Sequence, residues 1–111
     1  MDTKYFYIEQ YQVFYYSGSS DKEEAAYINC FDSKMNQVGI IKFLYDQIPL
    51  RPDVIIPNIG AIIHYHLSRF NDVIGLLEHG KGGYQSMFIS FDEANGVYAL
   101  CNNLYVPVGD K

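Results

Sequence analysis

Residues 59–80 read IGAIIHYHLSRFNDVIGLLEHG, and the spacing of their apolar side chains changes partway along. From Ile59 to Leu67 the side chains alternate with the two-residue period of a strand. From Phe70 onward the apolar side chains recur at helical spacing and form one stripe. The pattern predicts a strand over 59–67 that leads directly into a helix over 68–79.

The expected helix carries signals at both of its ends. Ser68 suits the first position, because its hydroxyl can accept a hydrogen bond from a free N–H group of the first turn. Asp72 lies near the positive end of the helix dipole, and His79 lies near the negative end. Gly80 follows as the residue that commonly ends a helix. Because so short a helix is marginal alone, we expect its apolar stripe to lie against a sheet.

Three segments in the first half of the chain are rich in aromatic and β-branched residues, which predicts strands. They run from Tyr5 to Tyr16, from Ala25 to Phe31 and from Val38 to Tyr45. In the first segment the apolar side chains do not keep to one face, so we expect a bulge within Glu9–Gln12. An antiparallel meander is the simplest topology for these three strands.

The segments on either side of the helix complete the expected sheet. Gln47–Asn58 contains three prolines, which predicts an irregular connection in which Val54–Ile56 pairs only briefly, at an edge. Beyond the helix we predict strands over 84–91 and 97–101. Between them, Asn95-Gly96 can take the positive φ angles of a tight hairpin.

This order of segments predicts an α+β fold, because runs of strands with one helix lack the regular alternation of a doubly wound parallel sheet. We expect a strongly bent antiparallel sheet, or half-barrel, of about six strands with the principal helix packed against it. A chain of 111 residues with 49% hydrophobic content fits one domain over 1–111. We expect the C-terminal tail from about residue 107 to be mobile.

The charge of the chain narrows its partners. Thirteen acidic and eight basic residues give a formal net charge of −5. A nucleic-acid backbone requires clustered Lys and Arg, which this sequence does not supply, so we expect no nucleic-acid partner. The acidity also argues against a membrane surface, and no apolar run has the length of a membrane helix. Because no apolar leader follows Met1, we expect a soluble cytoplasmic protein.

His64 and His66 are the most suggestive polar pair, because residues two apart on a strand project from the same face. Two imidazoles could begin a metal site, but no second pair of Cys or His completes one, so we expect no metal. The two histidines are instead candidates for ligand contact, and acid–base chemistry by them stays open. Cys30 and Cys101 fall within expected strands, where we expect reduced core residues.

We expect no cofactor and assign no catalytic residue. The Gly-rich segment 80–83 resembles a phosphate-binding loop in composition, yet it follows a helix, where the dipole is negative and disfavours an anion. The sequence also lacks the G-x-S-x-G motif of a nucleophilic serine. These features favour a protein that is not an enzyme.

The first expected strand carries the best candidates for contact with another protein. With eleven Tyr, seven Phe and no Trp, the chain is rich in rings, and Tyr7, Tyr11 and Tyr15 share one face of this strand. Tyrosine is enriched at binding hot spots. Only Lys4 supplies the kind of charge that commonly guards a sheet edge. We therefore expect this strand to contact a second copy of the chain.

The leading hypothesis is a small non-enzymatic protein-interaction module that self-associates as a homodimer. The alternative is a small-ligand binding protein or enzyme, whose pocket between helix and sheet is lined by tyrosines, His64 and His66. A weaker alternative is a small acidic inhibitor or immunity-type protein, which only the size and the charge of −5 suggest.

Overall fold

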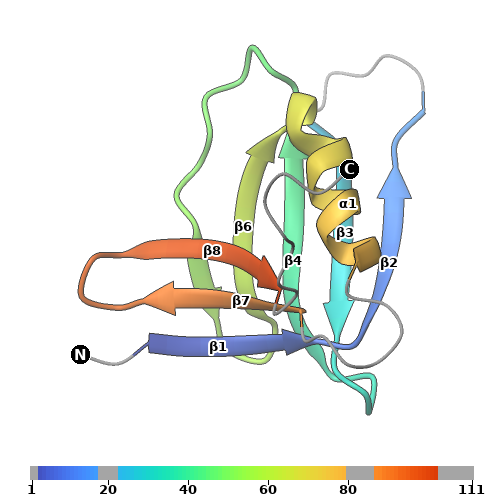
Figure 1. Cartoon of the computed structure of the whole chain (residues 1–111). Coiled ribbons are helices and arrows are strands. Elements are labelled where there is room, and N and C mark those ends of the chain that lie inside the picture. The colour runs from blue at the N-terminus through green and yellow to red at the C-terminus, as the bar shows by residue number, and fades with distance from the viewer. Residues whose placement is uncertain (1–2, 18–22, 80–86, 103–111) are drawn as a thin grey trace, which may run out of the picture.

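The computed structural model describes residues 3–17, 23–79 and 87–102. This part of the chain contains eight strands and one α-helix, so the α+β class with one principal helix is confirmed (Figure 1). The strands are β1 (Thr3–Ile8), β2 (Gln10–Tyr15), β3 (Glu24–Phe31), β4 (Gln37–Leu44), β5 (Val54–Ile56), β6 (Gly60–His66), β7 (Met87–Asp92) and β8 (Val97–Asn102), and the helix is α1 (Phe70–His79). Within these residues, no helix has the length and apolar character needed to cross a membrane.

The strands form two sheets that cross steeply (Figure 1). A three-stranded sheet has the order β1-β7-β8, and a five-stranded sheet has the order β2-β3-β4-β6-β5. Within the larger sheet, β2, β3 and β4 form the antiparallel meander that the sequence predicts. Instead of one bent sheet there are two sheets, and the N-terminal segment contributes β1 to one and β2 to the other. The described residues form eight strands, where about six were expected.

One strand pair departs from the antiparallel expectation. β6 lies between β4 and β5 and runs parallel to β4. The proline-rich connection after β4 carries the chain past the position of β6 to the edge of the sheet, where β5 pairs antiparallel with β6. β5 is the short edge strand expected at Val54–Ile56. Because β5 runs opposite to β4, the hairpin that follows gives β6 the direction of β4.

Glu9 divides the long N-terminal strand that the sequence predicts. Its backbone N–H donates to the carbonyl of Phe31 over 2.8 Å, and Phe31 also lies opposite Gln10. Two residues that face one define a β-bulge, which bends the strand and increases its twist. The expected bulge is therefore confirmed at Glu9, and β1 and β2 on either side of it join different sheets.

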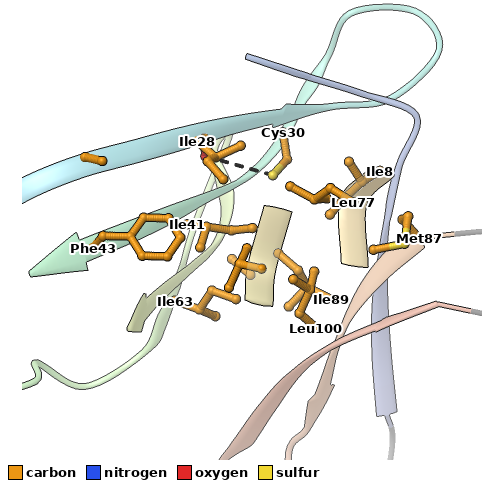
Figure 2. Close-up of a cluster of buried hydrophobic side chains, with 13 residues drawn as sticks. Ile8, Ile28, Cys30, Ile41, Phe43, Ile63, Leu77, Met87, Ile89 and Leu100 are labelled. Carbon is orange, nitrogen blue, oxygen red and sulfur yellow. Dashed lines mark hydrogen bonds between the residues drawn. The ribbon is translucent and has the colours of Figure 1, made fainter. Parts of the chain in front are cut away.

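One hydrophobic cluster joins both sheets and the helix (Figure 2). Val73 and Leu77 of α1 are 3% and 2% exposed, so the expectation that the apolar stripe packs on the sheet is confirmed. No polar side chain among the described residues is buried with them. The other large side chains of the cluster come from β1, β3, β4, β6, β7 and β8: Ile8, Ile28, Ile41, Phe43, Ile63, Met87, Ile89 and Leu100.

α1 begins two residues later than expected, and the prediction of Ser68 as its cap is wrong. Leu67–Arg69 form a 3₁₀ turn, and the backbone N–H of Ser68 donates to the carboxylate of Asp46 over 3.0 Å. The acceptor for this amide thus comes from the connection after β4, which no local sequence signal reports. Asp72 lies in the first turn of α1, and the helix ends at His79, both as expected.

The C-terminal hairpin forms as predicted between β7 and β8. The carbonyl of Asp92 accepts a hydrogen bond from the N–H of Gly96 over 2.8 Å, and the carboxylate accepts from Ala94 and Asn95. Gly96 has a φ of +65°, whereas the φ of Asn95 is not positive. Other expectations lie outside the described residues: the stop at Gly80, the first residues of the strand over 84–91, and the tail from 107.

Gly60, the first residue of β6, lies against Val38 near the start of β4. Its φ is +101°, a conformation that side chains with a Cβ rarely adopt. A Cβ at this position would lie 1.9 Å from the carbonyl oxygen of Val38. The parallel pairing of β4 and β6 therefore requires glycine here.

We expect Gly60→Ala to lower the free energy of unfolding by more than about 1–3 kcal/mol, the range for a strained backbone alone, because the new methyl group also collides with Val38. Gly75→Ala is the matched control. Gly75 lies inside α1 with no atom within 4 Å of an added Cβ, so alanine there should stabilise the protein by about 0.5–1 kcal/mol. Chemical denaturation measures both variants. An unchanged midpoint for Gly60→Ala would contradict this arrangement of β4 and β6.

Candidate functional site

In the described part of the chain, β2 is an edge strand, and no residue of the strand itself carries a charge. Among the described residues it pairs with β3 alone, and no described element lies along its other side (Figure 1). Its sequence, QYQVFY, contains no charged residue and no proline. Natural sheet edges are commonly guarded by charge, by proline or by a covering element. Within residues 3–17, 23–79 and 87–102, β2 therefore offers an unprotected edge to another strand.

The hydrogen-bond pattern shows which backbone groups face this edge. The N–H of Tyr16 donates to the carbonyl of Ala25 over 3.0 Å. In an antiparallel pair the hydrogen-bonded positions recur at every second residue, so the even-numbered residues of β2 point their N–H and C=O groups toward β3. Tyr11, Val13 and Tyr15 consequently point theirs toward the free edge.

The side chains of Tyr11 and Tyr15 lie on the helix side of β2. The Tyr11 hydroxyl donates to the carboxylate of Glu78 over 2.5 Å, and the Tyr15 ring lies 5.2 Å from the ring of Phe70 between centroids. Partial burial, aided by the hydrogen bond to Glu78 and its charge, raises the pKa of Tyr11 to about 12. These two contacts hold the edge strand against α1.

Tyr7 lies in β1, on the three-stranded sheet. The bulge at Glu9 changes which alternate residues face the core, so that even-numbered residues do so in β1. In β1 the side chain of Ile8 enters the core, whereas Tyr7 is 50% exposed. The Tyr7 ring lies 5.5 Å from Phe88 and 6.2 Å from Tyr5, between centroids. The structure therefore brings Tyr11 and Tyr15 to one side of β2 and places Tyr7 elsewhere.

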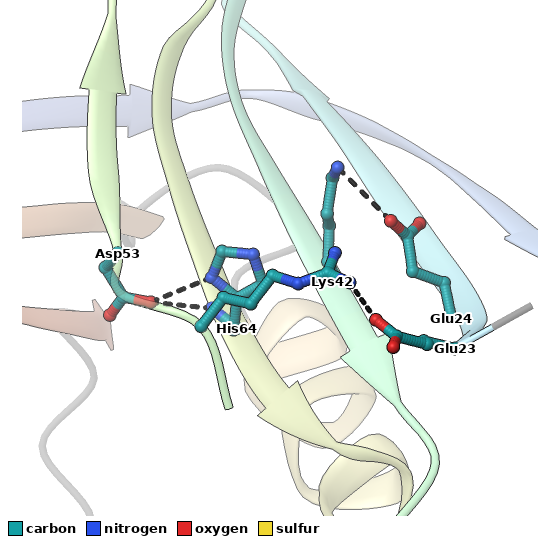
Figure 3. A network of polar contacts seen from close by, with 6 residues as sticks. Glu23, Glu24, Lys42, Asp53 and His64 are labelled. Atoms are coloured by element: carbon teal, nitrogen blue, oxygen red, sulfur yellow. Dashed lines mark hydrogen bonds and ion pairs between the residues drawn. The ribbon is translucent and has the colours of Figure 1, made fainter. Parts of the chain in front are cut away.

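His64 and His66 project from the face of β6 opposite the helix, and each holds a different point of the proline-rich connection. Asp53 accepts the backbone N–H of His64 over 2.9 Å, and its same oxygen lies 3.3 Å from Nδ1 of that side chain (Figure 3). Nε2 of His66 lies 2.8 Å from the carbonyl of Ile48, so it must carry the proton. Both histidines thus tie the connection to β6.

The two imidazoles do not form a site with the tyrosines. The space between α1 and the sheet is filled by the hydrophobic cluster, and His64 and His66 lie on the opposite face from Tyr11. The His64 side chain is 6% exposed. Among the described residues, no group of three or more His, Cys, Asp or Glu is arranged to hold a metal ion.

A shallow hollow of about 440 Å³ opens over β3 and β4 on the face of the five-stranded sheet opposite the helix, which we call the outer face. Tyr16 and Tyr27 form its aromatic side, and Asn29, Glu24 and Lys42 supply polar groups. The Lys42 ammonium lies 3.3 Å from the carboxylate of Glu24 (Figure 3). The hollow therefore combines aromatic rings with the neutral amide of Asn29 and with an ion pair whose two charges cancel.

A second hollow of about 350 Å³ adjoins the first and shares Tyr16 and Glu24 with it. Arg51 and Glu23 complete its lining and form an ion pair with each other. Sequence reasoning missed these residues, because no spacing connects positions so far apart in the chain. The one available signal was Lys42, a charged residue that interrupts the apolar run of β4.

Cys30 is a core residue, as the sequence predicts. Its side chain is fully buried and forms no disulfide. Burial raises the pKa of its thiol to about 12, so the reactive thiolate is disfavoured near neutral pH. The side chain of Cys101 lies outside the described part of the chain.

Comparison with protein-family models, with curated proteins and with solved structures finds no match.

We expect Tyr11→Phe to lower the free energy of unfolding by about 1 kcal/mol, because it removes the hydrogen bond to Glu78. In the wild type, the raised pKa of Tyr11 adds stability that is fully present below the usual tyrosine pKa of 10.0 and is lost as pH rises toward 12. The variant should lose less stability across this window. Denaturation at several alkaline pH values measures the difference.

Tyr5→Phe is the matched control, because it removes one hydroxyl from a ring that is 52% exposed. Its free energy of unfolding should stay within about 0.5 kcal/mol of the wild type, as for surface substitutions generally. Equal losses in the two variants would contradict the role of the Tyr11–Glu78 contact.

Proposed function

We propose that this protein is a non-enzymatic interaction module that self-associates as a homodimer through the free edge of β2. The observation that carries the proposal is an edge strand without charge or proline that presents the backbone groups of Tyr11, Val13 and Tyr15. Addition of a strand to such an edge is a recurrent mode of protein recognition, in which main-chain hydrogen bonds supply affinity. A second copy brings an identical edge, so pairing forms a closed two-fold dimer.

Exposed apolar side chains along the same edge support this proposal. Val13, Phe14 and Tyr15 are 40%, 39% and 59% exposed. A paired strand would remove part of this surface from water, which is favourable. β2 itself also lacks the charges that oppose pairing of like with like, since its sequence is QYQVFY and Lys4 lies on β1, where it contacts Glu93 at 3.5 Å.

Sedimentation equilibrium over a range of concentrations tests the proposal and should give a mass of two chains at high concentration. Val13→Pro should shift the mass to one chain. The N–H that proline removes points away from β3, so the ladder within the sheet is kept while the free edge is blocked. A wild type that remains a monomer at high concentration would refute the proposal.

Phe14→Pro is the control for a general effect of proline in β2. The N–H of Phe14 points toward β3, so its loss removes a ladder bond and should lower the melting temperature more than Val13→Pro does. Val13→Pro should remain folded by circular dichroism while it loses self-association. If both variants unfold alike, the assigned direction of the backbone groups is wrong.

Binding of a small neutral ligand in the outer-face hollow is the second candidate function. The volume of about 440 Å³ suits a small molecule. Because Lys42 pairs with Glu24, the described lining of the hollow has no free charge to attract an anion, and Asn29 offers both donors and acceptors. Rings beside such groups suit a polyhydroxylated molecule such as a sugar.

Titration with neutral monosaccharides, followed by amide chemical shifts, tests this second candidate. The resonances of Tyr16, Tyr27 and Lys42 should move with a saturating dependence on concentration. Tyr5 and Tyr7 on the other sheet serve as internal controls and should not move. Absence of saturable shifts at the hollow would contradict the candidate.

A further inference from the structure

We infer that the homodimer has one register, in which Val13 faces Val13 of the second copy across the two-fold axis. Tyr11 of each copy then lies opposite Tyr15 of the other, and the two five-stranded sheets continue as one. This inference rests on the proposed function, and it adds which residues meet and where the symmetry axis passes.

The direction of the backbone groups excludes half of the antiparallel registers. Tyr11, Val13 and Tyr15 present their N–H and C=O groups to the free edge, whereas Gln12 and Phe14 use theirs toward β3. Only registers that place odd-numbered residues opposite odd-numbered residues join outward groups with outward groups. The two-fold axis must therefore pass between the same residue of the two copies. The possible residues near the middle of β2 are Gln12, Val13 and Phe14.

The length of β2 selects one register among these. With Val13 on the axis, all three outward residues meet partners within the straight part of the strand, since Tyr11 faces Tyr15. Moving the axis to Gln12 places Tyr15 opposite Glu9, where the bulge breaks the strand. Moving it to Phe14 places Tyr11 opposite Ser17, beyond the end of the strand. The Val13 register therefore forms the most hydrogen bonds.

The side chains agree with the same register. On the helix side, it sets the ring of Tyr11 opposite that of Tyr15, and aromatic cross-strand pairs stabilise a sheet. Both rings are already positioned by contacts with α1, through Glu78 and Phe70. No charged residue of β2 faces another, because the strand has none.

A charge exchange at position 13 tests the register. Val13→Lys alone and Val13→Glu alone should each give monomers, because the axis would bring two like charges directly opposite each other. A mixture of the two variants should restore a mass of two chains, as a heterodimer of one Lys and one Glu copy. Sedimentation of each variant and of the equimolar mixture provides the readout.

Val97→Lys is the matched control, since Val97 is an exposed strand valine, at 55%, on the three-stranded sheet. It should leave the dimer intact. A dimer that survives Val13→Lys, or a mixture that stays monomeric while each variant is folded, would overturn the Val13 register. If Val13→Pro still abolished that dimer, the β2 edge would remain the interface in another register, and the proposed function would stand.

Disulfide trapping gives an independent measurement of the same register. Opposed Cα atoms in a hydrogen-bonded antiparallel pair are about 5.5 Å apart, within the range that a disulfide spans. In a Cys101→Ser background, Val13→Cys should form a covalent dimer on mild oxidation, whereas Tyr15→Cys should not, because its counterpart lies at Tyr11. Covalent dimers from Tyr15→Cys and none from Val13→Cys would overturn the inference.

Discussion

The bulge at Glu9 is the constraint on which the rest of the structure depends. Its N–H shares the carbonyl of Phe31 with the next residue, and the extra residue bends the chain so that β1 leaves the plane of β2. β1 then pairs with β7, and the small sheet crosses over the large one. Ile8 and Ile89 thereby reach the same core as Ile41.

The same bend leaves β2 at the edge of its sheet. Because β1 turns away with the small sheet, β2 keeps one neighbour, β3, among the described strands. Tyr11 and Tyr15 secure the strand from the helix side, so the edge is held in place while its outward backbone groups stay available. A strand that is well ordered before it binds loses less entropy on pairing. The interaction proposed for this edge therefore follows from the way the core is closed.

The contacts of His64 and His66 depend on the tertiary structure and cannot be derived from the alternation of residues along β6. Their alternation on β6 correctly implies that His64 and His66 share a face. It carries no information about Asp53 and Ile48, which lie in the part of the proline-rich connection that precedes β5. The carboxylate of Asp53, the residue just before β5 begins, accepts the N–H of His64 in place of a strand partner. The polar pair that looked most like a ligand site therefore serves to hold the connection on the sheet.

The sequence by itself determined the elements whose signals are local. These are the alternation of β6, the stripe of α1, the bulge at Glu9 and the turn before β8, because periodicity and turn chemistry act over a few residues. Only the tertiary structure decided the parallel pairing of β4 with β6, the amide of Ser68 bound to Asp46, and the hollow beside Lys42. Each of these joins residues far apart in the chain, and no local spacing encodes such a contact. The free edge of β2 depends on both levels. The sequence determines that the strand has no charge and no proline, and the tertiary bend at Glu9 determines that the strand lies at an edge.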